Sequence, residues 1–232
     1  MTLNYTEACE QVQRLLTAYP KLNVVKSDPT IIQLCGSIEI YRSACNYTLQ
    51  KEYPIEIIIP LDNDKLPTVI ETNNMIDSDY PHRYSDGSLC LETSTTIRLR
   101  FVDGFDLVAW MDEFVEPYFF SYEYYDRYGS LPFGERPHGL NGVIHTYQEL
   151  FHTDDLEKAC LLLRYVAEST YRGHAPCPCG SGERLRKCHG QYLQPFMTNP
   201  KKKAIALSDL QYLRKELTAI EHPRRNNTKA KR

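Results

Sequence analysis

The sequence has no apolar run of the length that a membrane-spanning helix needs, which is about 18 residues. It begins Met1-Thr2-Leu3-Asn4-Tyr5-Thr6-Glu7, without the basic and apolar regions of a secretory signal. These absences lead us to expect a cytoplasmic protein with no membrane partner. The net charge is also small, −3 at pH 7, which excludes a chain that is strongly basic or acidic throughout.

No disulfide framework is expected either. Three of the eight cysteines cluster near the C-terminal end, and the other five are scattered. Scattered thiols in a chain without an export signal are typical of a reduced compartment. At 42% hydrophobic and 25% charged, the 232 residues have the composition of a globular protein with one sizeable core and a small appendage.

The last part of the chain is basic. Residues 201–232 hold ten lysines or arginines against three acids, and residues 222–232 have no large apolar side chain. We expect a disordered, solvated tail there. A nucleic-acid partner for this tail is the minority interpretation, since such tails are most often solvated.

The hydrophobic pattern predicts an α+β protein. A first helix begins with Thr6 as its cap and runs to Ala18. An antiparallel meander follows, and then a helix over residues 104–116 that Pro117 interrupts. The predicted strands cover 31–40, 41–49, 55–59 and 68–72, and two later helices cover 141–151 and 154–170, with Thr153 and Asp154 as caps of the second.

Cys90 is the first candidate functional residue. It follows the turn residues Ser85-Asp86-Gly87-Ser88 and lies between two leucines. A thiol presented at such a bend can meet a large acyl donor, because the thiolate is the nucleophile and needs access. The alternative is a buried structural thiol, as free cysteines often are.

The surroundings of Cys90 resemble the ubiquitin-conjugating enzymes. In that family a His-Pro-Asn tripeptide and a polar turn precede the catalytic cysteine, and the family's proline falls on Pro81 without a gap. Tyr53-Pro54 and Leu66-Pro67-Thr68-Val69 are similar to two strands of the family fold. The resemblance covers roughly residues 1–120. It implies the ubiquitin-conjugating fold, with Cys90 carrying a protein C-terminus as a thioester.

The sequence departs from the family at two positions. The family's asparagine falls on His82 and its histidine on Tyr80. A neutral imidazole offers one N–H donor, so His82 could stabilise an oxyanion, or it could act as a base. The other interpretation of His82 is a loop histidine without a catalytic role.

A closer resemblance concerns the block that follows Pro117. The aromatic run 118–128 and the loop 131–139 are similar to bacterial ubiquitin-conjugating-like proteins of the antiphage operons called CBASS. There the partner is a cyclic-nucleotide synthase. The resemblance implies that the acyl donor is the C-terminus of that synthase, and a ubiquitin-like protein is the other candidate.

A second motif is Cys177-Pro178-Cys179-Gly180-Ser181-Gly182 followed by Lys187-Cys188-His189-Gly190. Two close pairs of thiol and imidazole ligands favour a zinc site in a reduced protein. The string resembles the SEC-C motif, best known from the C-terminus of the SecA translocation ATPase. That resemblance implies a closed structural zinc site with Cys177, Cys179, Cys188 and His189 as ligands.

Two functions compete. One is a conjugating enzyme that moves an acyl group from a donor protein to an acceptor lysine, with Cys90 and His82 as catalytic residues. The other is a zinc-stapled adaptor that binds a ribosome, nucleic acid or acidic partner. The predicted domains are a conjugating domain over 1–135, a helical extension over 136–172, the zinc motif over 173–192, and a helix with the basic tail over 193–232.

Overall fold

The computed structural model describes the backbone of residues 4–61 and 65–229, and the side chains of these residues up to position 218. The chain divides into two compact units. The first consists of Met1–Glu92 and Asp103–Glu135, and the second of Thr93–Val102 and Arg136–Arg232. None of the helices in the described part is long and apolar enough to cross a membrane. The four domains proposed from the sequence stay a prediction.

The first unit begins with helix α1 (Tyr5–Ala18). Its cap is Asn4, not the predicted Thr6. The Asn4 side chain accepts a hydrogen bond from the Glu7 amide at 2.9 Å, and the Glu7 carboxylate accepts one from the Asn4 amide at 3.4 Å. This reciprocal capping box satisfies two backbone donors at once, which a cap at position 6 would not do.

An antiparallel sheet follows, in the order β1 (Leu22–Asp28), β2 (Ile31–Ala44), β3 (Tyr47–Pro60) and β4 (Thr68–Glu71). The α+β class and the meander predicted from the sequence are therefore confirmed. The predicted breaks after residues 40 and 49 are both wrong, since β2 continues to a two-residue turn at Cys45 and Asn46, and β3 then runs unbroken to Pro60. Both turn residues have positive φ, 50° and 59°, as the tight turn of a hairpin requires.

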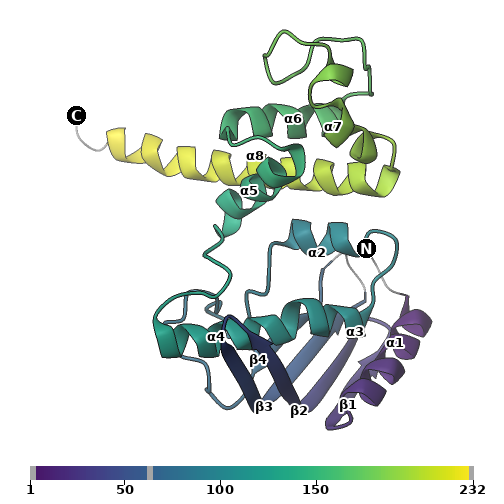
Figure 1. The fold of residues 1–232 in the computed structure, drawn as a ribbon, viewed down its shortest axis with the longest axis vertical. Helices are drawn as coiled ribbons and strands as arrows, with labels where there is room; N and C mark the ends of the chain where they lie inside the picture. The colour runs from purple at the N-terminus through teal and green to yellow at the C-terminus, as the bar shows by residue number, and fades with distance from the viewer. Residues whose placement is uncertain (1–3, 62–64, 230–232) are drawn as a thin grey trace. The chain divides into compact units, whose positions relative to one another are not determined.

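Strand β1 was not predicted, because only its first residue, Leu22, is buried and no alternation marks it. In β2 and β3 the alternation is clear. Ile32 pairs with Ile59, and Leu34 pairs with Ile57. These four side chains are almost completely buried on one face; α4 packs against β2 and β3, and α1 lies beside β1 (Figure 1). The hydrophobic core of the first unit lies between this face and the helices.

The sequence predicts a helix that Pro117 interrupts. In the structure the helical segment after the sheet continues past this residue. It runs through α3 (Leu107–Trp110), the π-helical turn η1 (Met111–Val115) and α4 (Glu116–Tyr128). Pro117 lies directly after the π-helical turn, in which the Glu116 amide donates to the Met111 carbonyl five residues back instead of four, so the helix passes the proline with an altered hydrogen-bond pattern. The aromatic run of α4 packs into the core, and the Phe119 ring stacks on Tyr53 with the centroids 4.3 Å apart.

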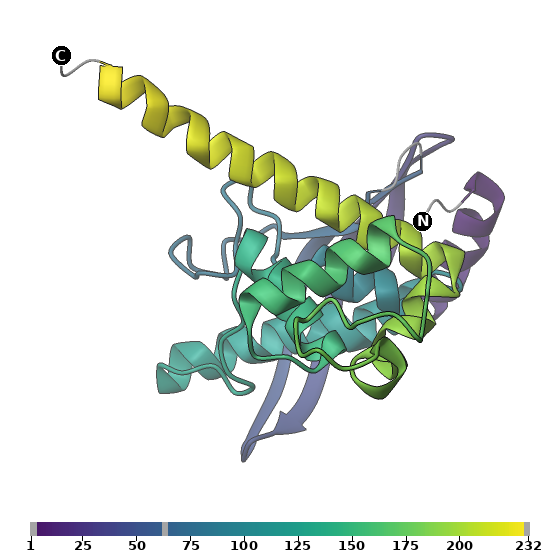
Figure 2. The ribbon, with the colours of Figure 1, turned by 90° about the horizontal axis from the view of Figure 1, so that it is seen from above.

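The second unit is helical. Helices α5 and α6 pack on each other, and α6 lies along α8 (Figure 2). The helices predicted at 141–151 and 154–170 are present with ends shifted by up to two residues, and the second is capped by Asp155. The elements of this unit are α2 (Ser94–Arg100), α5 (Gly139–Phe151), α6 (Leu156–Glu168), the 3-10 turn η2 (Leu185–Lys187), α7 (Gly190–Met197) and α8 (Pro200–Lys229).

A buried carboxylate joins three of these helices. Asp209 on α8 accepts hydrogen bonds from Thr95 on α2 and Tyr147 on α5, both at 2.8 Å. The backbone of α8 continues to Lys229, where the sequence predicts disorder. Helix propensity does not account for this continuation, since the stretch contains Pro223 and two asparagines. Its side chains and residues 230–232 lie outside the described part of the chain.

Candidate active site and metal centre

A short hairpin holds Cys90 in the first unit. Arg83 and Leu89 form a bridge across it, and the Cys90 amide donates to the His82 carbonyl at 2.8 Å. The Leu89 amide donates to Val69 of β4 at 2.9 Å, which attaches the hairpin to the sheet. Cys90 is therefore fixed by backbone hydrogen bonds on both sides.

The turn of this hairpin is the polar stretch seen in the sequence. The Asp86 carboxylate accepts hydrogen bonds from the Ser88 amide at 3.0 Å and from its hydroxyl at 2.6 Å. These bonds hold the pKa of Asp86 below its usual range, the Ser88 hydroxyl being the main cause. The ionised aspartate closes the turn and sets the direction of the strand that ends at Cys90.

His82 is opposite Cys90 in the hairpin. A ring nitrogen of His82 lies within 4.8 Å of the Cys90 Sγ. The His82 carbonyl accepts a second hydrogen bond, from the Tyr118 hydroxyl at 3.1 Å, and the ring of Tyr80 lies 5.3 Å from the imidazole, centroid to centroid. The backbone and the ring of His82 are thus both held by tyrosines.

Sequence reasoning placed Tyr80 at the position of the family's histidine, but it gave Tyr118 no part in the site. Tyr80 is buried, and its ring contacts those of Tyr118 and Tyr122, which are one helical turn apart on α4. Burial raises the pKa of Tyr80, so the phenol stays neutral. The spacing of four residues between aromatic side chains in the run 118–128 is the signal that could have indicated a common face.

The Cys90 thiol is half-buried, and its environment opposes ionisation. Burial raises its pKa and is the largest effect. A hydrogen bond with Tyr84 lowers the pKa, and the carboxylate of Glu92 raises it. At neutral pH the resting group is therefore a thiol, and a base must remove its proton before it can act as a nucleophile. The catalytic roles of Cys90 and His82 stay predictions.

The metal-ligand candidates lie on a second hairpin, in the helical unit. The Cys177 amide donates to Glu183 at 2.8 Å, and the Leu185 amide donates to Ala175 at the same distance. Gly180 lies in the intervening loop at a φ of +80°, a left-handed conformation that favours glycine.

The second pair of candidates follows η2. The Cys188 amide donates to the Leu185 carbonyl at 3.0 Å, and His189 then caps α7. A Cβ on Gly190 would lie 2.6 Å from that same carbonyl oxygen, too close for any other residue without movement. Glycine at this position lets α7 start directly against η2, which keeps His189 beside Cys188.

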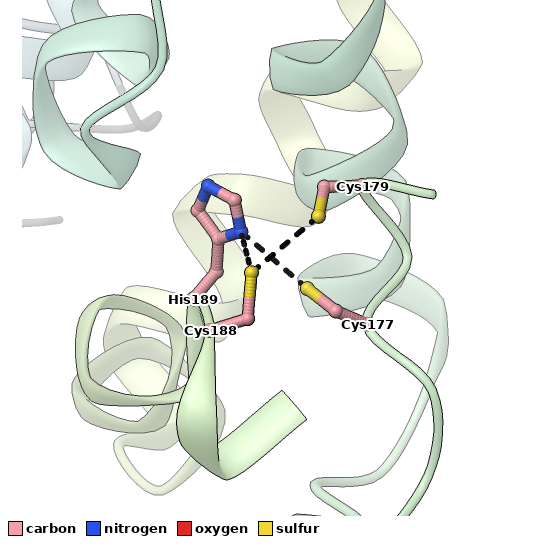
Figure 3. Close-up of side chains that lie close together, drawn as sticks. All are labelled: Cys177, Cys179, Cys188 and His189. Atoms are coloured by element: carbon pink, nitrogen blue, oxygen red, sulfur yellow. Dashed lines mark hydrogen bonds between the residues drawn. The ribbon is translucent and has the colours of Figure 1, made fainter. Parts of the chain in front are cut away.

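The four candidate side chains point toward a common centre (Figure 3). Their ligand atoms all lie within 4.8 Å of one another. The His189 Nδ1 lies 3.1 Å from the Cys188 Sγ and 3.4 Å from the Cys177 Sγ, and the Cys179 and Cys188 sulfurs are 3.6 Å apart. A tetrahedral zinc site separates its sulfur and nitrogen ligands by about 3.5–3.8 Å.

The donor set also fits a metal chemically. Burial raises the pKa of Cys177 to about 11, while backbone amides of Cys179 and His189 point at its sulfur and oppose that effect. Amides aimed at a sulfur stabilise the thiolate form that binds metal. Three thiolates and one imidazole would be enough for the four positions of a tetrahedral metal ion.

Residues 175–191 match the SEC-C motif. The match covers the four ligand candidates and little else of the chain. No curated protein and no solved structure shows a significant match. The SEC-C motif and the tight Cys/His group together indicate a metal-binding module.

The SEC-C motif shares the core of the helical unit. Cys177, Cys179 and Leu185 are buried in one hydrophobic cluster with Leu163 of α6 and Leu193 of α7. The contribution of Leu185 was not foreseen from the sequence, although a lone leucine among charged residues is a signal for an inward-facing position. The hairpin that carries these ligand candidates is therefore anchored in the hydrophobic core of the helical unit.

Proposed function

We propose that this protein is a ubiquitin-conjugating-like enzyme that carries a protein C-terminus as a thioester on Cys90 and transfers it to an amine. The observation that supports this most is the hairpin that places Cys90 opposite His82, with a backbone hydrogen bond of 2.8 Å between them. The helix, four-stranded meander and covering helices of the first unit agree with the fold that the resemblance implies.

The chemistry proceeds in two steps. The donor arrives as an activated acyl group, because a free carboxylate is a poor electrophile. The Cys90 thiolate attacks its carbonyl carbon, a C–S bond forms and the activating group leaves. An acceptor lysine then attacks the thioester, a C–N bond forms, the C–S bond breaks and the amine loses a proton.

His82 has two roles in this scheme. The raised pKa of Cys90 requires a base, and the imidazole within 4.8 Å can take the thiol proton directly or through one water. In the second step the ring N–H can donate to the oxyanion of the tetrahedral intermediate. The Tyr80 and Tyr118 contacts hold the histidine in place for both steps.

The donor that we favour is the C-terminus of a CBASS-like nucleotide synthase, and a ubiquitin-like protein is the second choice. The support is the resemblance of residues 118–139 to the corresponding block in those antiphage proteins. The metal in the SEC-C motif is proposed to be zinc, in a purely structural role, because no coordination position remains for water.

The test is adduct formation with the candidate donor and its activating system. Wild-type protein should give a higher-mass species that thiols cleave, Cys90→Ala should give none, and Cys90→Ser should give an adduct that thiols do not cleave. Cys35→Ser is the matched control, since Cys35 is also half-buried in the first unit. Absence of a Cys90-dependent adduct with either donor would overturn the proposal.

One observation favours a second candidate, a zinc-stapled adaptor without catalysis. The environment of Cys90 opposes the thiolate, as it would for a structural cysteine. In that case Cys90→Ser should leave the protein's partners and biological activity unchanged. An effect of this substitution on activity, with binding retained, would exclude the adaptor as the sole function.

A further inference from the structure

A cavity of about 300 Å³ lies in the first unit, between the end of β2 and the helical segment of η1 and α4. Three of its lining side chains are aromatic: Tyr41 of β2, Phe120 of α4 and Phe133 of the loop that follows α4. Phe120 is buried, whereas Tyr41 and Phe133 are 69% and 65% exposed. The rings of Phe120 and Phe133 are 6.1 Å apart, centroid to centroid. The cavity is thus bounded by one buried ring and two exposed ones.

Three charged side chains also line the cavity, and two of them are largely engaged with each other. Arg42 donates from Nη2 to the Asp112 Oδ1 at 2.6 Å and from Nε to the Glu116 Oε2 at 3.1 Å. The Tyr19 hydroxyl donates to the other Glu116 oxygen at 2.8 Å. Within the described part of the chain, the Oδ2 of Asp112 makes no hydrogen bond or ion pair. The Asp112 side chain is 65% exposed, so this oxygen can be reached by a ligand.

The charge of the cavity and of its surroundings is negative. Arg42 offsets only one of the two carboxylates of the lining, Asp112 and Glu116. The whole first unit has the same sign, since Met1–Glu92 and Asp103–Glu135 contain 21 acids against 8 lysines or arginines, a net charge of −13. The small net charge of the chain, −3, hides this because the second unit is basic. Such a field attracts a cationic ligand and repels an anionic one.

We propose that this cavity binds an arginine side chain from a basic segment of a partner protein. A guanidinium group is planar and positively charged, so it can stack on an aromatic ring and donate hydrogen bonds to a carboxylate at the same time. Tyr41 and Phe133 supply the rings, and Asp112 supplies the carboxylate oxygen. A lysine ammonium has no planar face and is more strongly hydrated, so the same groups hold it less firmly.

The exposed rings favour a protein segment over a free small molecule. Sites for small molecules enclose most of the ligand, whereas Tyr41 and Phe133 are both about two-thirds exposed. The aromatic surface also extends past the cavity. The Tyr47 ring lies 5.6 Å from that of Phe120 and 6.0 Å from that of Tyr128, and Tyr128 is 51% exposed. Residues that flank the arginine in a protein segment can pack on this additional surface.

The experiment measures the fluorescence anisotropy of a short labelled peptide, in which arginine alternates with glycine and serine, with the full chain. Asp112→Asn should weaken binding roughly tenfold, because a charge-assisted hydrogen bond is lost. Phe133→Ser should weaken it roughly fivefold, because one of the stacking rings is lost. The matching lysine peptide should bind wild type roughly threefold more weakly or worse. Asparagine keeps an oxygen that can accept from Arg42, and thermal unfolding checks that both variants stay folded.

Two matched controls separate the cavity from the acidic unit around it. Glu113→Gln removes the same charge at the exposed residue next to Asp112, which does not line the cavity. Val25→Ser removes an apolar side chain of β1 that is 58% exposed. Both variants should bind the arginine peptide like wild type.

Equal losses in Asp112→Asn and Glu113→Gln would mean unspecific attraction by the acidic unit and would overturn the proposal, as would equal binding of the two peptides. Agmatine that binds as tightly as the peptide would assign the cavity to a small guanidinium compound instead. Self-association of wild type that Phe133→Ser abolishes, without peptide binding, would assign it to a second copy of the chain. Cys90→Ser should bind the arginine peptide like wild type, so the result is independent of the proposed acyl transfer.

Discussion

The hydroxyl of Tyr118 on α4 donates a hydrogen bond to the backbone carbonyl of His82, at 3.1 Å. The same carbonyl accepts the Cys90 amide at 2.8 Å. A core helix of the first unit is thus tied directly to the hairpin that carries the candidate nucleophile. A displacement of α4 would therefore shift both His82 and Cys90.

Tyr118→Phe removes only one hydroxyl group, but it should affect both the stability of the protein and the reaction at Cys90. Loss of one hydrogen bond should lower the free energy of unfolding by about 1 kcal/mol. It should also reduce the rate of acyl transfer from Cys90, because the His82 backbone is less firmly held. Denaturant unfolding and single-turnover transfer measure the two effects. Tyr41→Phe is the control, since Tyr41 is 69% exposed. Transfer at the wild-type rate in Tyr118→Phe would exclude a positioning role.

The reactivity of Cys90 should rise with pH beyond the range of an ordinary cysteine. Burial raises its pKa, so the thiolate fraction keeps increasing where a free thiol is already ionised. Glu92→Gln removes a carboxylate that raises the pKa and should speed alkylation at pH 8. Tyr84→Phe removes a hydrogen bond that lowers the pKa and should slow it.

Iodoacetamide labelling, followed residue by residue by mass spectrometry, gives the rate at Cys90 in each variant. Glu10→Gln, an exposed acid on α1, should leave the rate unchanged. A wild-type rate that levels off below pH 8 would mean a depressed pKa and contradict the prediction.

His82→Ala should slow acyl transfer by roughly a hundredfold or more, the usual cost of losing an acid-base group or an oxyanion donor. His82→Asn should recover part of the rate, because an amide restores a donor but cannot act as a base. Both variants need a check by thermal unfolding, and the expected change in stability is small. Full activity of His82→Ala would remove this residue from the mechanism.

The metal site should be structural, with about one zinc per chain. Cys188→Ser should lose the metal and also destabilise the helical unit, since Cys177 and Cys179 share its core with Leu163 and Leu193. Cys90 should label at its normal rate in this variant. Cys160→Ser, a half-buried thiol of α6 outside the quartet, should keep its zinc. Zinc retained after Cys177→Ser and Cys188→Ser together would disprove the ligand set.

Asp209 should make the helical unit relatively more stable in acid. Burial raises the pKa of Asp209 and is the largest effect. The hydrogen bonds from Thr95 and Tyr147 and the positive charge of Arg98 all lower this pKa. The folded state then binds the proton more tightly than the unfolded chain, so the contribution of Asp209 is greatest at low pH and is lost as pH rises through the folded pKa. The stability of wild type relative to Asp209→Asn should therefore increase from pH 7 to pH 5.

Thermal unfolding of both proteins over this range gives the difference directly. Asp126→Asn, an exposed acid of α4, should show a difference that does not change with pH. A constant difference for Asp209→Asn would mean that the carboxylate does not titrate in this range.

Part of the structure could be predicted from the sequence because it is local. Cys177, Cys179, Cys188 and His189 lie close together in the chain, and glycines at the turns leave few ways to arrange them. The meander was predicted for a similar reason, since alternation in β2 and β3 marks one buried face. The turn before Cys90 is encoded by four consecutive turn-forming residues, Ser85-Asp86-Gly87-Ser88.

Only the tertiary structure decided the rest. Tyr118 meets His82 across 36 residues, and Thr95 meets Asp209 across 114. Neither contact leaves a periodic trace in the sequence, because one hydrogen bond between distant elements needs only one residue from each. Pro117 misled the prediction because a π-helical turn precedes it, and that turn depends on packing around Trp110 and Met111. Short-range order was thus fixed by neighbouring residues, whereas the partners of His82 and Asp209 depend on how whole helices pack.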